Sequence, residues 1–294
     1  MGFSSMDDLV NEITNNGKFI RNDWNKITTA GITYAAGRWY DFSLLAGTPI
    51  ANAFAGTALA WRSCDETTGN GTQIFGLQHG GNVSPDTKHV LNVSAVTAVA
   101  TGVPAQLMLV DLQGYWPGIS NNTTSPQTLT GTPSLRYTNG AGCRLFWVQT
   151  ATSGATAQNL ALSYSNTVPT SGRSLPVTVS MTASAVAGHI SHSGTAANNY
   201  GPFLPLASGD TGVSTVASVT FSAANTGTGA LCLARPLLTL PITTAAVAAE
   251  RDLLNQLPSL PQVKDGACLT WLYFAGAATA ASTNFYGAVE FGWG

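Results

Sequence analysis

The chain has 294 residues and a formal net charge of −2, and only 9% of its residues are Asp, Glu, Lys or Arg, against about 25% in a typical soluble domain. Its basic residues are scattered singly, so we do not expect direct nucleic-acid binding. No apolar run reaches the roughly 18 residues that suggest a membrane helix, and residues 1–8 lack the basic and apolar regions of a secretory signal.

Residues 1–36 are predicted to form a helical arm that is richer in charge than the rest of the chain. Ser5 is followed three positions later by an acidic residue, a spacing typical of a helix-capping box. Leu9 and Ile13 lie four residues apart, on one face of the expected helix. A second short helix is expected over residues 23–27. The sequence leaves open whether this arm packs on its own domain or reaches a neighbouring subunit.

From Gly31 onward the sequence predicts β-strands. Val, Thr, Leu and aromatic residues occur in short runs that Gly, Pro, Asn and Ser interrupt, as in sandwiches and barrels. The run 90–97 nearly alternates apolar and polar residues and is predicted to be half-buried, whereas the continuously apolar run 107–110 is predicted to be buried on both faces. One exception is the segment 245–254, which is predicted to be helical.

Short matches recur along the chain at an almost constant spacing. Asp86-Thr87 recurs as Asp210-Thr211, and the run at 107–109 recurs at 231–233, both 124 positions on. Asn139-Gly140 recurs as Asp265-Gly266, 126 positions on, and both pairs are strong turn signals before a predicted strand. This spacing exceeds the roughly 20 to 50 residues of a solenoid repeat and fits a whole small domain.

These patterns predict a mainly β fold of two tandem, similar β-sandwich (jelly-roll-like) domains with a short helical N-terminal arm. The arm spans residues 1–36, the first β-sandwich residues 37–168, and the second, an internal duplicate, residues 169–294. A duplicated domain of this kind favours a building block over a catalyst.

The charge deficit is concentrated in one part of the chain. Between residues 145 and 234 only Arg173 and Asp210 are charged, whereas residues 1–26 contain seven charged residues. Because charged surfaces and sheet edges keep β-proteins apart, we favour obligate assembly over a monomer with a neutral Ser/Thr/Asn surface.

Five residues are candidates for the interface of such an assembly. Tyr115 and Trp116 precede a proline and form the aromatic cluster expected to be most exposed, and large aromatic residues often anchor interfaces. Leu9, Ile13 and Trp24 are the apolar residues of the predicted arm.

No catalytic constellation stands out, and we expect no enzymatic activity, no cofactor and no bound metal. His189 and His192 are three residues apart, but no Cys or carboxylate lies within fifteen residues of either, which favours a polar loop over a metal site. The four cysteines are far apart and favour buried free thiols, with a disulfide left open. A glycosidase would require two of the few acidic residues to converge in a cleft.

Three segments of the chain resemble virion structural proteins of tailed bacteriophages. They are Gly37-Arg38-Trp39-Tyr40-Asp41, the block from Ile74 to Leu91, and Leu135 to Gly142. The family includes cement, or decoration, proteins that bind the outside of a capsid shell, commonly as trimers. The resemblance implies a structural role and no catalytic residues.

We therefore expect a non-enzymatic virion protein on the capsid surface, made in the host cytoplasm. Its expected partners are copies of itself, as a homotrimer, and the major capsid protein, with neither nucleic acid nor membrane. The alternative is a carbohydrate- or receptor-binding module of a phage tail or spike, which requires exposed aromatic residues on loops of both copies.

Overall fold

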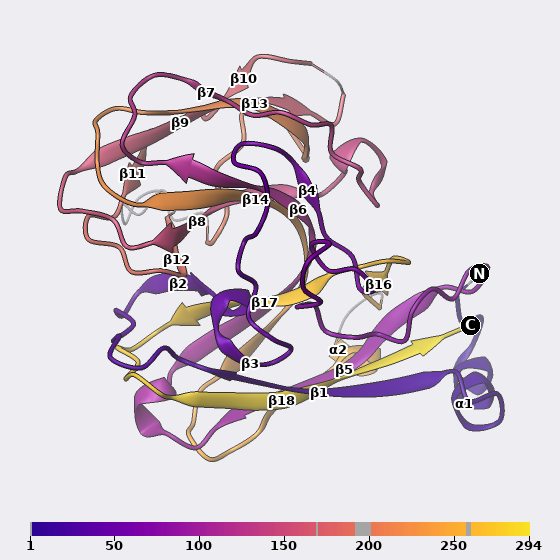
Figure 1. Ribbon diagram of the computed structural model, residues 1–294. Helices are drawn as coiled ribbons and strands as arrows, with labels where there is room; N and C mark the ends of the chain where they lie inside the picture. The colour runs from indigo at the N-terminus through magenta and orange to yellow at the C-terminus, as the bar shows by residue number, and fades with distance from the viewer. Residues whose placement is uncertain (1, 169, 192–200, 257–259) are drawn as a thin grey trace.

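The computed structural model describes residues 2–168, 170–191, 201–256 and 260–294 (Figure 1). This part of the chain is mainly β, with antiparallel strands in three sheets and one helix longer than a single turn, α1 (Met6–Thr14). The prediction of a mainly β fold with a short N-terminal helix is confirmed. No helix among the described residues is long and apolar enough to span a membrane.

A closed barrel of six strands lies at the centre of the molecule. β14 pairs with both β6 and β8, and the ring continues through β12, β2 and β17 back to β6. The barrel strands are β2 (Arg38–Asp41), β6 (Ala105–Ser120), β8 (Arg144–Ala151), β12 (His189–Ser191), β14 (Thr228–Ile242) and β17 (Leu269–Ala275), and β4 (Arg62–Ser63) adds to β6.

Side chains fill the barrel interior. Ala230, Cys232 and Ala234 of β14 belong to the interior cluster, whereas Leu231 and Leu233, which alternate with them, pack in a different cluster outside the barrel wall. This separation follows from the two-residue period of a strand. The wall is therefore buried on both faces, as its continuous apolar runs predict. Large members of the interior cluster are Trp39, Val110, Tyr115, Phe146, Ile190 and Leu272.

Two outer sheets cover opposite sides of the barrel (Figure 1). We call them the β5 sheet, with strand order β15-β5-β18-β1-β3 and β16 also on β5, and the β9 sheet, with order β10-β9-β13-β7 and β11 also on β9. Each encloses a hydrophobic core against the barrel wall. The β5 sheet contains β1 (Phe19–Ile27), β3 (Ala46–Thr48), β5 (Lys88–Thr97), β15 (Ala249–Asp252), β16 (Gln262–Val263) and β18 (Asn284–Trp293). The β9 sheet contains β7 (Gln127–Thr128), β9 (Gln158–Asn166), β10 (Arg173–Ser174), β11 (Val179–Met181) and β13 (Val213–Phe221).

Strand pairings in one half of the molecule have counterparts in the other half. β5 pairs with β18 as β13 pairs with β9, and β6 pairs with β17 as β14 pairs with β8. β6 and β14 pair with each other, and Asp111 of one strand lies opposite Arg235 of the other, 124 positions on. Every sheet combines strands from both sides of residue 168. A boundary between residues 168 and 169 would therefore cut through all three sheets.

The prediction of a second helix over residues 23–27 is wrong. This segment belongs to β1, whose nine residues all pair with β18, from Phe19 opposite Gly292 to Ile27 opposite Asn284. Trp24 is buried within the strand, and its ring packs 5.3 Å from that of Trp271. The partner strand lies more than 250 residues away in sequence, so local helical spacing could not reveal it.

The helix predicted over residues 245–254 is also largely absent. Residues 249–252 form β15, which pairs with β5 along its whole length, and only one turn of helix follows, α2 (Leu253–Gln256). Here the free edge of β5 supplies hydrogen-bond partners that override the helical preference of an Ala/Glu/Leu-rich segment. Three 3-10 turns complete the described elements: η1 (Phe42–Leu44), η2 (Ala100–Gly102) and η3 (Thr138–Gly140).

A buried carboxylate ends β2. Asp41 is 2% exposed and accepts hydrogen bonds from the backbone N–H and the hydroxyl of Ser43, at 2.8 and 2.9 Å. Burial raises the pKa of Asp41 to about 6, although the bonds from Ser43 and the ammonium of Lys26 act in the opposite direction. The native state therefore binds this proton more tightly than the unfolded chain does.

The unfolding free energy is accordingly expected to depend on pH through Asp41. Its stabilising contribution is complete below the unfolded pKa of 3.8 and is lost as pH rises through about 6. Between about pH 4 and pH 7 the wild type should lose roughly 2 kcal/mol relative to Asp41→Asn, which has no proton to release. Denaturant unfolding of both proteins across this range measures the difference, and parallel pH profiles would contradict it.

Candidate functional site

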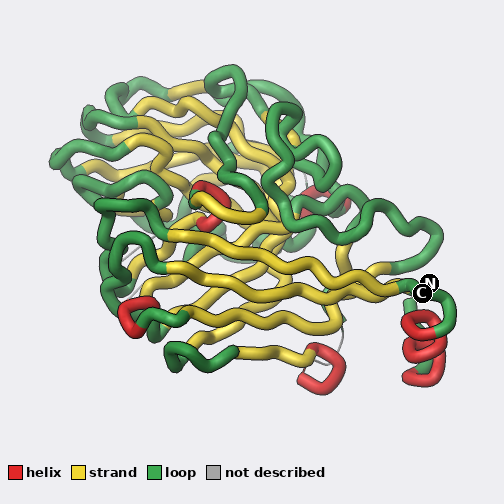
Figure 2. Tube along the Cα trace, turned by 60° about the horizontal axis from the view of Figure 1, so that its bottom comes forward, coloured by secondary structure: helices red, strands yellow, loops and turns green. Residues whose placement is uncertain are grey.

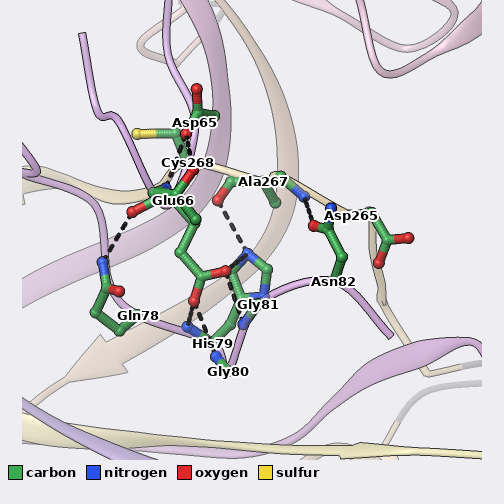
Figure 3. A network of polar contacts seen from close by, with 12 residues as sticks. Asp65, Glu66, Gln78, His79, Gly80, Gly81, Asn82, Asp265, Ala267 and Cys268 are labelled. Carbon is green, nitrogen blue, oxygen red and sulfur yellow. Dashed lines mark hydrogen bonds and ion pairs between the residues drawn. The ribbon is translucent and has the colours of Figure 1, made fainter. Parts of the chain in front are cut away.

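The most concentrated set of buried polar groups surrounds Glu66 (Figure 3). Its side chain is 2% exposed and accepts hydrogen bonds from three successive backbone N–H groups, those of His79, Gly80 and Gly81. The bonds from Gly80 and Gly81 are each 2.9 Å long. Both glycines have positive φ values, 88° and 74°, so glycine is needed for the chain to turn its N–H groups inward. Successive N–H groups arranged in this way form a concave anion site, which a side chain of the same chain fills.

Two basic side chains complete this network. Lys88 is 1% exposed, and its ammonium donates to the carbonyls of His79 and Gly81 and contacts Nδ1 of His79 at 3.0 Å. Burial lowers the pKa of Lys88, while the carboxylate of Glu66 acts against this shift. The pKa of His79 is also lowered by burial, so its imidazole is neutral near pH 7. Its Nε2 lies 3.0 Å from the carbonyl oxygen of Ala267 and 3.2 Å from Glu66.

A reciprocal pair of bonds joins the same loop to the turn before β17. The carboxylate of Asp265 accepts the N–H of Val83 at 3.0 Å, and the side-chain carbonyl of Asn82 accepts the N–H of Gly266 at 2.9 Å. The network thus fastens residues 79–83 to residues 265–267, more than 180 positions away. His79 has no exposed surface, and the contacts of this network hold the loop in position.

Beside this network lies a second buried ion pair. The guanidinium of Arg136 contacts both carboxylate oxygens of Asp111, at 3.1 and 2.5 Å, and also donates to the carbonyls of Cys64 and Leu112. Asp111 is completely buried and accepts the N–H of Cys268 as well, at 3.1 Å. The pair thereby ties the η3 region to β6 and to the start of β17.

The polar cleft between these two networks holds about 300 Å³. Asp86 pairs with Lys18 at 2.7 Å, and the charges of Lys88 and Arg136 are engaged by the partners described above. Of the charged groups at the cleft, Asp86 and Arg136 are therefore each paired with an opposite charge of the same chain. Its lining residues are Ser84, Asp86, Thr87, Lys88, Arg136, Gln262, Val263, Lys264 and Asp265.

Four of the five interface candidates lie inside the chain. Tyr115 and Trp116 have no exposed surface, and Leu9 and Trp24 are 5% and 3% exposed. The ring of Tyr115 lies in the barrel interior, and its hydroxyl accepts a hydrogen bond from the side chain of Asn70 and donates one to the carbonyl of Ala55. The indole N–H of Trp116 donates to the carbonyl of Thr130. Within this chain these side chains are therefore part of the core or packed against it. Ile13 is half-buried on α1.

The structure instead exposes a face on the outer side of the β9 sheet whose described residues carry no charge. In β9, the residues that alternate with the buried Leu160 and Leu162 are small, and they lie beside equally small residues of β13 and β11. The outward residues are Thr128, Asn159, Ala161, Ser163, Ser174, Ser180, Ser218 and Thr220.

The two charged residues between positions 145 and 234 pair with each other at the edge of the β9 sheet. Arg173 contacts Asp210 at 3.0 Å, and the side chains of Tyr164 and Asn166 donate to the same carboxylate. The hydrogen bonds from Arg173, Asn166 and Tyr164 lower the pKa of Asp210 to about 2. Neither charge is therefore free to keep another protein away from the uncharged face.

The outer face of the β5 sheet, on the opposite side of the molecule, is different. Arg21 contacts Asp23 at 3.1 Å and Glu290 at 3.3 Å across β1 and β18, and Glu290 lies opposite Asn92 of β5. The chain thus has one charged outer sheet and one neutral outer sheet, with the barrel between them (Figure 1).

The remaining candidates for chemistry are dispersed. His189 is buried on β12, and His192 lies outside the described residues. All four cysteines are buried free thiols. Within the described ranges, no three His, Cys, Asp or Glu side chains gather in a way that could hold a metal ion.

Comparisons with known proteins do not assign the chain to a family. No family model and no curated protein sequence matches it. Among solved structures, the VP2 subviral particle of infectious bursal disease virus aligns over 93% of this chain and 80% of its own, with 8% identity and a TM-score of 0.16. The structure of the Gt strain of that virus aligns over 94% and 79%, with 9% identity and a TM-score of 0.17. Similarity at this level does not establish a shared function.

Proposed function

We propose that this chain is a non-enzymatic virion structural protein that assembles as an oligomer, a trimer in the simplest case, and binds the outside of a phage capsid as a cement protein. The observation that carries the proposal is the uncharged outer face of the β9 sheet. Charged side chains on sheet faces and edges normally keep β-proteins apart in solution. An uncharged face of Ser, Thr, Ala and Asn suits close contact with another protein, because little charge must be desolvated.

The difference in charge between the two outer sheets supports a particular orientation of the chain on the capsid shell. The neutral β9 sheet faces the major capsid protein in this proposal, and the charged β5 sheet faces solvent. The chain has an accessible surface of 11597 Å², close to the roughly 11,800 Å² expected of a compact monomer of its mass. Assembly would therefore cover a surface that is already formed and would need little backbone rearrangement.

The matching strand pairings support an internal duplication within this assembly. Two jelly-roll-like units that exchange strands through the shared barrel account for the pairing of β5 with β18 and of β13 with β9. A trimer of such chains presents three β9 sheets to the shell, which suits a position of local three-fold symmetry. The chain would be made in the host cytoplasm and function in the virion.

No observation favours the carbohydrate-binding alternative to the same degree. That function needs exposed aromatic platforms, whereas Trp24, Trp39, Trp116, Trp147 and Trp271 are buried in the cores. The two other tryptophans are half-buried.

Electron microscopy of the virions that carry this protein tests the proposal. We expect its density on the outer capsid surface at local symmetry positions, with the β9 sheet against the shell. Density confined to the tail would overturn the cement role in favour of a tail or spike module. Absence of the protein from purified virions would overturn both.

A further inference from the structure

Helix α1 stands at the end of the β5 sheet, beside both termini and away from the barrel (Figure 2). One face of the helix is anchored, because Leu9 is buried and Lys18 bridges Glu12 at 2.8 Å and Asp86 at 2.7 Å. The ring of Phe3, just before the helix, packs 5.8 Å from that of His89. The helix is therefore held in a fixed position on its own chain.

The flank of α1 beside Leu9 is apolar and is left exposed by its own chain. Met6 and Val10 are 57% and 52% exposed and lie four residues apart, so their side chains are neighbours. Exposed apolar residues scattered singly need no explanation, but a fixed pair on one helix face forms a small patch. Asp7, three residues before Val10, borders this patch, and it makes no ion pair with any described residue.

A groove lined mainly by apolar side chains lies where β14 passes β6. It holds about 240 Å³ and is lined by Met108, Pro236, Leu237, Leu238, Thr239 and Arg251. Between Pro236 and Leu238 the register of β14 shifts, and the bulge leaves Leu237 half-buried. A bulge at such a place redirects a side chain and interrupts regular pairing.

One cation borders this groove. Arg251 donates to the carbonyl of Thr239 at 2.6 Å, and no carboxylate of the described residues lies within ion-pair distance of it. The groove thus combines apolar walls with one uncompensated guanidinium. The exposed face of α1 offers the reverse combination, two apolar side chains beside one uncompensated carboxylate.

We propose that the groove receives α1 of a second copy of this chain, with Met6 and Val10 against Met108 and Leu237, and with Asp7 facing Arg251. Helix and groove are different surfaces, so the contact is head-to-tail and closes into a ring when the rotation between copies permits. This inference deepens the proposed function and rests on the self-assembly that it requires. It names the contact through which the copies join while the β9 sheet stays free for the shell.

Disulfide trapping between two different variants tests this contact. Purified Val10→Cys and Leu237→Cys chains are mixed in equal amounts with oxidised glutathione, which accepts the two electrons as the thiols lose two protons and join. The native cysteines are buried and should not compete. We expect a cross-linked dimer in the mixture and little in either variant alone. A mixture of Val10→Cys with Tyr286→Cys, which places a thiol on the exposed face of the β5 sheet, is the matched control.

Charge reversal provides the second measurement. Asp7→Arg and Arg251→Glu should each weaken self-association about tenfold, and the double variant should restore it, because the two charges then attract again. Cross-linking no stronger than in the Tyr286→Cys control, or no rescue by the double variant, would overturn the contact. If the wild type nevertheless forms an oligomer by light scattering, only this contact is wrong. If it is a monomer at every concentration, the self-assembly of the proposed function fails as well.

Discussion

Replacing Arg136 with methionine is expected to lower the free energy of unfolding by about 3–5 kcal/mol. Methionine retains much of the apolar length of arginine but leaves the carboxylate of Asp111 completely buried without its cation. Two backbone carbonyls, those of Cys64 and Leu112, also lose their donor. Denaturant unfolding monitored by tryptophan fluorescence measures the change, provided the slope against denaturant stays constant.

The same substitution at Arg21 is the control. Arg21 also contacts two carboxylates, those of Asp23 and Glu290, but it does so at the surface, where water screens the charges. We expect Arg21→Met to leave stability almost unchanged. Replacing both members of the buried pair, as Arg136→Met with Asp111→Leu, should recover part of the loss because no buried charge is then left unpaired. Equal effects of Arg136→Met and Arg21→Met would show that the buried pair does not stabilise the fold.

Replacing Glu66 with alanine is the second large effect that we expect, again about 3–5 kcal/mol of unfolding free energy. Three N–H donors lose their acceptor, the buried one of His79 and the part-buried ones of Gly80 and Gly81, at roughly 1–3 kcal/mol for each donor left without water or another partner. The buried ammonium of Lys88 also loses the carboxylate that contributes most to stabilising its charge. Some of this cost is recovered if water enters the vacated space, which keeps the total below the sum of the parts.

Hydrogen exchange distinguishes this local effect from general loss of stability. In Glu66→Ala the amides of Gly80 and Gly81 should exchange faster than those of the barrel strands, because their acceptor is gone. Glu250→Ala is the matched control, since Glu250 is exposed and accepts a single bond from Asn92, at 2.7 Å. Unchanged protection at residues 80 and 81 in Glu66→Ala would contradict the role assigned to the carboxylate.

Local signals in the sequence identify several elements correctly. Helix α1 begins where the capping pattern places it, with Ser5 accepting the N–H of Asp8 at 3.0 Å. The turn signal at Asn139-Gly140 is also confirmed, since both residues adopt positive φ, 51° and 73°, shortly before β8 begins. These features depend on neighbouring residues alone, and they are therefore readable from a short window of sequence.

Features that depend on distant partners could not be read in this way. β1 is a strand because β18 lies beside it, and Trp116 is buried because the loop before β4 covers it, with Trp61 4.6 Å away. The aromatic cluster at residues 115–116 has the composition of an interface anchor, but composition does not distinguish an interface from a core. The Glu66 network was equally hidden, although the adjacent glycines at 80 and 81 do signal an unusual backbone.

The charge deficit, in contrast, gains meaning only once the fold is known. The neutral segment between residues 145 and 234 supplies most of the β9 sheet and concentrates on one outer face, while charged residues lie on the opposite sheet. An even distribution of the same few charges would have suggested a merely neutral surface. Their separation supports a molecule with one side built for contact with protein.

The native mass of the purified protein at micromolar concentration tests this account most directly. Light scattering should give a multiple of the 30.4 kDa chain mass, three-fold for the trimer that we propose. Because few charges take part, the mass should hold when salt rises from about 0.1 M to about 1 M and the screening length falls from about 10 Å to about 3 Å. A mass of one chain under both conditions would contradict the account.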